Sequence, residues 1–280
     1  MPDDRGRRIV LEARPRPPVR GEEPPAHASA RPGGRSWWRG ALSLVVLLAL
    51  WQVAAIVAQS PVLPPPSAVG ASVYRHLLYG DLVQDVAVTL ARVAVAFALA
   101  MGIGSALGIL LGRNRVLDEF FDGWVVIGLN MPALVTIVLC YVWFGLNEVA
   151  AVLAVAINKT PLVVTITREG ARSLDRSLLE MAKVFEIPRG RVLRRIVLPQ
   201  LAPSLMASAR AGLALTWKIV LVVELLGRPN GVGFQIRSFF NFFDIAGILA
   251  YTFVFIAVIL MVENCLLRPL DRRVGRWRTT

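Results

Sequence analysis

Residues Leu179 to Pro203 read LEMAKVFEIPRGRVLRRIVLPQLAP, a basic segment that lies between two strongly apolar runs. The segment contains one proline in its centre, Pro188. This proline disfavours the helical region for Ile187 and itself suits the first turn of a helix, which predicts a break near residues 187–190. We therefore expect a helix, a turn and a second helix between two membrane-crossing runs.

Both expected helices are amphipathic. Ser177 and Glu180 have the S-x-x-E spacing of a capping box, which predicts the start of the first helix, and Leu178, Ala182 and Phe185 give it one apolar face. The second helix has an apolar side, Val192, Leu193, Ile196 and Val197, and a basic side, Arg189, Arg191, Arg194 and Arg195. Such a helix can dock in a groove on a partner. The alternative is a plain cytoplasmic loop whose arginines only fix topology.

The composition is typical of a polytopic, all-α membrane protein. The chain has 280 residues, 55% apolar and 18% charged, with a mean hydropathy of +0.58. Several apolar runs are near or above the roughly 18–20 residues that cross the hydrocarbon. The six predicted spans are residues 41–58, 86–111, 124–145, 149–167, 205–226 and 245–267. The fourth is the least regular, because Asn158, Lys159 and Pro161 interrupt it.

The charge distribution orients these spans. Most of the 31 basic residues lie before the first run, after the second, around the central loop and after the last run. Only Arg75, Arg228 and Arg237 fall in the opposite loops, so the positive-inside rule places both termini and the central loop in the cytoplasm. The net charge of +12 then reflects topology. Nucleic-acid binding is disfavoured, because no recognition motif accompanies the basic residues.

The chain divides by composition along its length. The first residues are rich in Arg and Pro, which predicts a disordered tail, and the long first apolar run favours an uncleaved anchor over a signal peptide. The predicted units are a cytoplasmic tail at 1–36, an anchor helix at 37–58, an external linker with an interfacial helix at 59–85, a five-helix core at 86–267 that includes the cytoplasmic loop 168–204, and a cytoplasmic tail at 268–280.

Motifs for bond chemistry are not found in the sequence. His27 and His76 are isolated, and Cys140 and Cys265 lie inside predicted spans without C-x-x-C spacing. The sequence contains no G-x-x-x-x-G-K-[ST] phosphate loop. We therefore predict no catalytic, metal or cofactor site in this chain. If ATP drives the protein, another chain must bind it.

A few polar residues lie deep in apolar runs and are candidates for a translocation path. A charge near the bilayer centre costs at least about 2.5–3.5 kcal/mol, so Lys159, Lys218 and Glu224 are expected to face the bundle interior or a watery path. Asn130 marks a kink or a polar lining point. The alternatives are that the lysines tie helices together and that Glu224 is interfacial, while Arg92 near a membrane edge is expected to snorkel.

The central loop resembles the EAA loop of permease subunits in bacterial ABC importers. That loop has a Glu-Ala-Ala triplet, a Gly four positions after the second Ala, and a terminal Leu-Pro. The matching residues here are Glu180, Met181 and Ala182 in the triplet, Glu186 in the Gly position, and Leu198 and Pro199 at the end. A Gly permits a left-handed turn at no steric cost, so Glu186 implies either a different backbone or mild strain.

Three further stretches resemble the permeases of the nitrate, sulfonate and taurine importer family: Leu63 to Val69, Thr89 to Asn114, and Val222 to Asp244. The resemblance implies the type I ABC importer permease fold in a bacterial inner membrane. It also implies a homodimeric pore in the lipid bilayer, ATP-binding cassette ATPase subunits docked on the cytoplasmic loops, and an external solute-binding protein that delivers a small, usually anionic solute.

The resemblance also assigns roles within the loop. It implies a coupling helix near residues 186–192, with ATP bound by the partner ATPase and no ATPase site in this chain. The predicted coupling residues are Glu180, Ala182, Glu186, Ile187, Pro188, Gly190, Leu198 and Pro199. A stand-alone secondary transporter is the alternative, but it would need interrupted helices in two related halves, and only residues 158–161 provide one. An intramembrane enzyme would need a catalytic set, and none is found.

Overall fold

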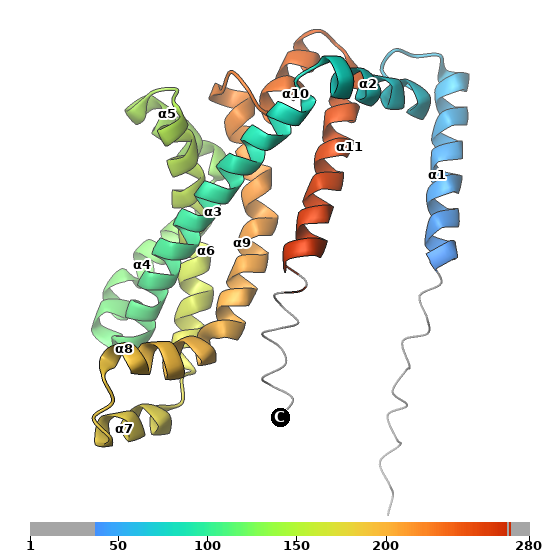
Figure 1. Ribbon diagram of the computed structural model, residues 1–280. Coiled ribbons are helices and arrows are strands. Elements are labelled where there is room, and N and C mark those ends of the chain that lie inside the picture. The colour runs from blue at the N-terminus through green and yellow to red at the C-terminus, as the bar shows by residue number, and fades with distance from the viewer. Residues whose placement is uncertain (1–36, 268, 270–280) are drawn as a thin grey trace, which may run out of the picture. The chain divides into compact units, whose positions relative to one another are not determined.

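The computed structural model describes residues 37–267 and 269, and every regular element in this part of the chain is a helix (Figure 1). The chain divides into two compact units, Met1–Leu47 and Leu48–Thr280. The predicted tails at 1–36 and 268–280 lie outside the described residues, apart from position 269. The all-α prediction is confirmed for the described part.

The helices follow the predicted order with shifted ends. The anchor helix is α1 (Trp37–Ala58), and α2 (Pro66–Tyr79), in the predicted external linker, begins with a proline at a position where its missing N–H is not needed. The remaining elements are α3 (Leu82–Arg113), α4 (Arg115–Asn130), α5 (Ala133–Phe144), α6 (Glu148–Arg172), α7 (Arg176–Val184), α8 (Arg189–Val192), a π-helical turn (Leu193–Val197), α9 (Leu198–Gly227), α10 (Val232–Asn241), α11 (Ile245–Val262) and a second π-helical turn (Glu263–Leu267).

The third predicted span is broken. Helices α4 and α5 meet at an angle of 98°, so the predicted span over residues 124–145 is sharply bent next to Asn130, where a kink was predicted. Pro132 explains the break, because it holds Met131 in an extended conformation (φ −70°, ψ 120°). The break leaves the Met131 carbonyl without a helical partner, and the side-chain amide of Asn158 donates a hydrogen bond to it at 3.3 Å.

The fourth predicted span is more regular than expected. Although Asn158, Lys159 and Pro161 were expected to interrupt it, α6 is one continuous helix with Pro161 inside it. It packs closely on α3, because a Cβ added to Gly104 would lie 2.6 Å from the side chain of Val163. Small residues at such positions let helix backbones approach each other in membranes.

The number of spans that the structure supports is smaller than six. Within the described residues, four helices are long and apolar enough to cross a membrane: α1, α3, α6 and α11. The bent pair of α4 and α5 would make a fifth. Helix α9 contains the predicted fifth span and has 30 residues, but it carries Arg210 and Lys218 and is not among the four.

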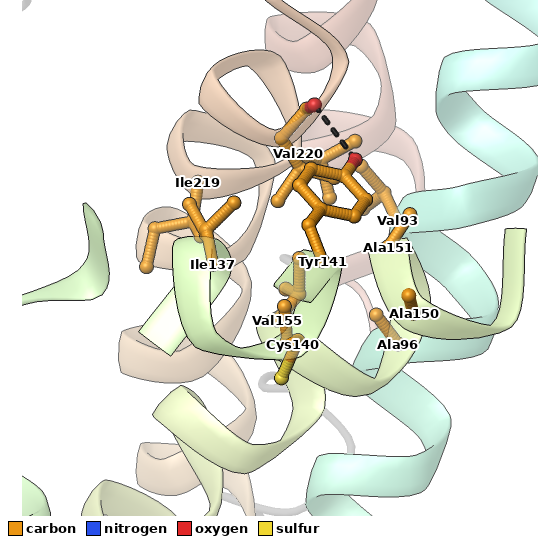
Figure 2. Close-up of a cluster of buried hydrophobic side chains, with 12 residues drawn as sticks. Val93, Ala96, Ile137, Cys140, Tyr141, Ala150, Ala151, Val155, Ile219 and Val220 are labelled. Atoms are coloured by element: carbon orange, nitrogen blue, oxygen red, sulfur yellow. Dashed lines mark hydrogen bonds between the residues drawn. The ribbon is translucent and has the colours of Figure 1, made fainter. Parts of the chain in front are cut away.

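The largest core cluster joins α3, α5, α6 and α9 (Figure 2). Small residues from α3 and α6 face larger ones from α5 and α9, and the phenolic oxygen of Tyr141 donates to the carbonyl of Val223 at 2.9 Å. Cys140 lies in this cluster as a small apolar residue, as predicted. Figure 1 shows α7 and α8 at the opposite end of these helices from α10. The core therefore lies between the α7–α8 end and the α10 end of these helices.

Candidate functional site

The central loop begins with a helix cap that differs from the predicted one. Asp175 caps α7: its Oδ1 accepts the backbone N–H of Ser177 at 2.8 Å and the Ser177 hydroxyl at 2.7 Å. These hydrogen bonds, the side-chain one foremost, lower the pKa of the Asp175 carboxyl. The predicted capping box of Ser177 and Glu180 is wrong, because the helix already starts at Arg176. Among the described residues, Glu180 makes no hydrogen bond or ion pair.

Helix α7 ends in a Schellman motif built around Glu186. The Ile187 N–H donates to the Ala182 carbonyl at 2.9 Å, and the Glu186 N–H donates to the Lys183 carbonyl at 3.0 Å. Glu186 has φ +49°, so the left-handed conformation that a Gly would favour is adopted by a Glu. Of the two alternatives, mild strain is therefore the one observed, at about 1 kcal/mol. Ala182 is buried beneath this turn.

The second half of the loop is continuous with the long helix α9. Helix α8 starts after Pro188, where the break was predicted, and passes through the π-helical turn into α9 without interruption. Leu198 and Pro199 form the first turn of α9. Val197 and Leu201 are buried in a small core at the base of the loop. Helices α8 and α9 therefore form one unbroken but bent helical segment (Figure 1).

The outer face of α7 is apolar and uncovered. Val184 and Phe185 are 80% and 71% exposed, and Met181 lies beside them, also exposed. We call these three residues the docking strip. The predicted apolar face is partly wrong, because Ala182 points into the protein while Leu178 and Phe185 point out. Gly190 in α8 has no heavy atom within 4 Å of an added Cβ, so the space beside it is open.

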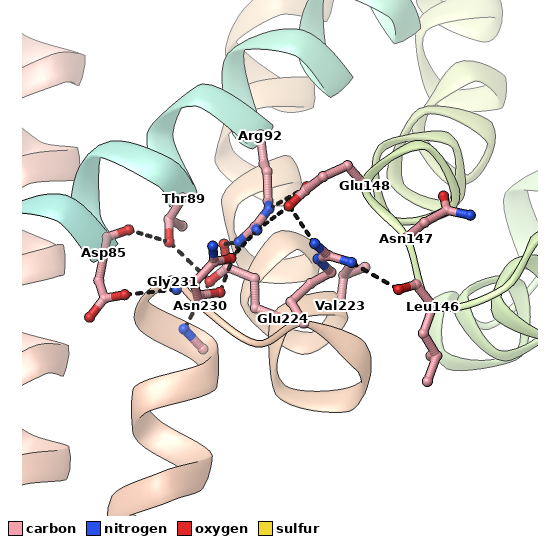
Figure 3. Close-up of polar contacts among 12 residues, drawn as sticks. Asp85, Thr89, Arg92, Leu146, Asn147, Glu148, Val223, Glu224, Asn230 and Gly231 are labelled. Carbon is pink, nitrogen blue, oxygen red and sulfur yellow. Dashed lines mark hydrogen bonds and ion pairs between the residues drawn. The ribbon is translucent and has the colours of Figure 1, made fainter. Parts of the chain in front are cut away.

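At the other end of the core, a buried ionic network joins α3, α6 and α9 (Figure 3). Arg92 is only 5% exposed and forms ion pairs with Glu148 at 2.6 Å and Glu224 at 2.7 Å. Glu224 is fully buried and also accepts the Thr89 hydroxyl and the Gly233 N–H, each at 2.9 Å. The expected snorkelling of Arg92 is therefore wrong, and Glu224 lies in the interior of the helix bundle.

The network extends to the turn before α10. Arg228 is buried and pairs with Glu148 at 2.6 Å, while Asp85 accepts the Gly231 N–H at 2.9 Å. Gly231 has φ +101°, which only glycine adopts without strain. The network thus fastens this turn to the ends of α3 and α6. Sequence reasoning missed it, although a carboxylate deep in an apolar run needs a cation, and Arg92 and Arg228 lie at the same end.

Among the described residues, no hydrogen bond or ion pair joins any two of the four predicted translocation residues, Asn130, Lys159, Lys218 and Glu224. Glu224 belongs to the ionic network, and the Asn130 amide donates to a carbonyl of its own helix at 2.8 Å. Lys159 is half-buried in α6. Lys218 is exposed, with its Nζ 5.5 Å from the centre of the Trp217 ring, and lines a cavity of about 240 Å³ together with Arg210. Of the four, Lys218 is the one that lines a described cavity.

Residues 100–276 match the family described as the binding-protein-dependent transport system inner membrane component. The chain belongs to this family. It is therefore a transmembrane permease subunit of an ABC importer, related to the nitrate, sulfonate and taurine permeases, and hydrolysis is carried out by a partner ATPase. Such permeases work with ATPase and solute-binding partners. The permease is a multi-pass membrane protein.

Curated relatives match the permease over most of their length. It is 29% identical over 267 residues to the putative aliphatic sulfonates transport permease protein SsuC of Bacillus subtilis (strain 168), covering 93% of this chain and 96% of that one. It is 28% identical over 242 residues to the taurine transport system permease protein TauC of Escherichia coli (strain K12), covering 84% of this chain and 88% of that one.

Solved structures show the same fold. The permease superposes on a chain of the MetNI methionine ABC transporter, in an inward-facing conformation, with a TM-score of 0.60 and 18% identity. The match covers 70% of the permease and 95% of that chain. Together with the all-helical architecture, it establishes the type I ABC importer permease fold.

Proposed function

We propose that the permease imports a small anionic solute, and that its loop between α6 and α9 is the EAA-type coupling loop on which the ATPase docks. The observation that carries this proposal is the docking strip, Met181, Val184 and Phe185, which is exposed at the end of α7, one turn before α8 continues into α9. A cluster of exposed apolar residues is typical of a protein interface. ATP is bound by the partner ATPase and not by this chain.

The proposed mechanism is mechanical. Closure of the ATPase subunits around ATP moves α7 and α8, and the continuous helix from Arg189 to Gly227 carries that movement across the membrane. The Schellman turn at Glu186 sets the angle between α7 and α8. The pore then alternates its access between the two sides, while the permease itself makes and breaks no covalent bonds.

The proposed path follows α9. Arg210 and Lys218 are eight positions apart and exposed, so they lie on nearly the same side of the helix, with Ala214 between them. Cations in a membrane helix normally face a water-filled path, because the hydrocarbon disfavours them. Lys218 would attract an anion, which agrees with the sulfonate and taurine relatives. Asn130 and Lys159 are proposed to line the same path, whereas Glu224 holds the helices around it.

The proposed assembly contains two permease copies in the lipid bilayer of a bacterial inner membrane. The pore lies between the copies, two ATPase subunits dock on the cytoplasmic loops, and an external binding protein delivers the solute. Both termini and the α7–α8 loop are cytoplasmic, in agreement with the positive-inside rule. The α10 end, with Arg237 and the Phe239–Phe243 segment, is external in this topology.

The test is co-purification of the tagged permease with its ATPase from membranes. Phe185→Asp places a charge in the docking strip, and Phe242→Asp is the matched control, because Phe242 is 80% exposed at the α10 end. We expect recovery of the ATPase with the wild type and the control, and at least about tenfold less with Phe185→Asp, since central aromatic contacts typically carry 2 kcal/mol or more. Equal recovery in both variants would refute the docking site.

A transport assay completes the test. Solute uptake in vesicles should require ATP and the co-purified ATPase, and Phe185→Asp should abolish it while leaving the amount of folded permease unchanged. ATP-independent uptake by the permease alone would instead identify a secondary transporter.

A further inference from the structure

A second, polar cavity lies near the loop between α6 and α9, and the proposed function does not use it. It has a volume of about 690 Å³ and lies where the ends of α3, α4, α6 and α7 meet. Four arginines line it, Arg113, Arg115, Arg172 and Arg176, together with three carboxylates on α4. Whether this cavity attracts cations or anions depends on which of these charges are already paired.

The three carboxylates are all paired within the protein. Asp118 accepts hydrogen bonds from Arg168, at 3.2 Å, and from Arg172. Asp122 accepts from Arg168 at 2.7 Å, and Glu119 forms an ion pair with Arg115 at 2.7 Å. Each of these carboxylates therefore has a guanidinium partner, and Arg172 also pairs with Glu169 at 2.7 Å. A cation entering this cavity would find no free carboxylate.

Two of the four lining arginines keep their charge available. Within residues 37–267, the side chains of Arg113 and Arg176 form neither an ion pair nor a hydrogen bond. They approach the cavity from different elements, the last turn of α3 and the first residue of α7. Planar guanidinium groups match the oxygens of phosphate, which they bind through paired hydrogen bonds. We propose that this cavity binds the phosphate group of an anionic lipid, held by Arg113 and Arg176.

The surface next to the cavity favours a lipid over a soluble phosphate. Glu119, Asp122, Val126 and Leu129 are spaced along one face of α4, so the two apolar residues continue the cavity wall toward the membrane. Val126 and Leu129 are 47% and 44% exposed. A lipid would place its headgroup between the arginines and an acyl chain along Val126 and Leu129. Basic pockets at the cytoplasmic ends of membrane helices bind anionic headgroups in this way.

Because Arg176 lies on α7, a ligand bound in this cavity would affect the helix on which the ATPase is proposed to dock. Because Arg176 is the first residue of α7 and Arg113 ends α3, a phosphate between them links the base of the coupling loop to the membrane core. The bound lipid then restrains the docking strip that α7 carries. This consequence rests on the proposed function, which places the α7 end at the cytoplasmic headgroups, but binding of the phosphate does not.

The experiment measures lipid retained on the purified permease by native mass spectrometry, after reconstitution in bilayers of phosphatidylcholine with or without phosphatidylglycerol. Arg113→Gln/Arg176→Gln removes both proposed ligands. Arg194→Gln/Arg195→Gln removes the same charge from two exposed arginines outside the cavity. We expect the wild type and the control pair to retain phosphatidylglycerol, and the Arg113→Gln/Arg176→Gln protein to lose at least about tenfold in retention.

Further arms identify the source of the phosphate. Displacement of the lipid by millimolar inorganic phosphate, with unchanged retention in Val126→Asn/Leu129→Asn, would assign the site to a soluble phosphate, whereas loss of retention in that variant supports a lipid. Equal retention in both arginine pairs would overturn the proposal. ATPase recovery from the same samples is a separate readout, so failure of the proposed function is distinguishable from failure of this site.

Discussion

The two ends of the permease core differ in which side chains they bury and which they expose. At the α10 end, the buried charges of Arg92, Glu224 and Arg228 are paired within the chain, Arg92 with Glu224 and Glu148, and Arg228 with Glu148. At the α7 end, apolar side chains such as Val184 and Phe185 are exposed. The first arrangement completes the fold within this chain, whereas the second is complete only with a partner. Substitutions at the first end should therefore affect stability, and substitutions at the second should affect assembly.

The largest expected effect comes from the centre of the ionic network. Glu224→Gln removes the fully buried carboxylate partner of Arg92 and leaves Arg92 with Glu148, whose side chain is half exposed. Removing one partner of a buried pair typically costs about 3–5 kcal/mol, so we expect a decrease of that order in the free energy of unfolding in detergent. Thermal or denaturant unfolding would measure it.

The control for this prediction removes the pair as a whole. Arg92→Met/Glu224→Met replaces both charges with apolar groups and leaves Glu148 paired with Arg228. We expect it to be more stable than Glu224→Gln, because no unpaired charge is then buried. If Glu224→Gln is as stable as the wild type, the network does not hold the helices together and the comparison between the two ends fails.

Two glycines give a matched test of the same contrast. Alanine at Gly231 would adopt φ +101°, and its Cβ would lie 2.6 Å from the carboxyl carbon of Glu224. Alanine at Gly190 meets no heavy atom within 4 Å. We expect Gly231→Ala to lower the free energy of unfolding by about 2 kcal/mol or more, and Gly190→Ala to change it by about 0.5 kcal/mol or less. Similar effects at both positions would contradict the contrast.

The sequence predicted the loop better than the network, for a physical reason. The turn at Pro188 and the resemblance at Glu186 are local patterns that a single stretch contains. The network joins residues far apart in the chain, with Arg92 and Glu148 separated by 56 positions and Thr89 and Glu224 by 135. Hydropathy places such residues in or near spans but does not say which side chains meet.

Two sequence predictions, the cap of α7 and the bend near Pro132, were inaccurate for different reasons. The cap of α7 was misplaced because Asp175 and Ser177 are both good capping residues, and the spacing of Glu180 favoured the second. The bend at Pro132 was underestimated because the apolar run continues across it, and hydropathy does not report direction. The translocation path was only partly predictable from the sequence. Lys218 and Glu224 both occur as charged residues within one apolar run, and only the packed structure shows that Glu224 is buried and Lys218 is exposed.

A smaller effect is expected at the Schellman turn. Glu186→Gly relieves the left-handed strain at φ +49° but makes the unfolded chain more flexible, so a net gain of about 0.5–1 kcal/mol in local stability is expected. Hydrogen exchange of the Ile187 amide, which closes the turn, should slow by a few-fold. Lys183→Gly, inside α7, should have the opposite effect, because glycine disfavours a helix interior. Faster exchange in Glu186→Gly would show that the glutamate is not strained.

The smallest effect concerns the exposed cap of α7 and its dependence on pH. Hydrogen bonding to Ser177 lowers the pKa of the Asp175 carboxyl below its unfolded value of about 3.9. A lowered pKa means that the cap stabilises α7 fully above the unfolded value and that this contribution is lost as the pH falls through the folded pKa. Hydrogen exchange in α7, followed from pH 6 down to pH 3 and corrected for intrinsic rates, should show this loss.

Asp175→Asn retains a capping oxygen without a titrating group, so its α7 should lack this component of the pH dependence. An identical pH profile in the two proteins would assign the acid sensitivity to another group.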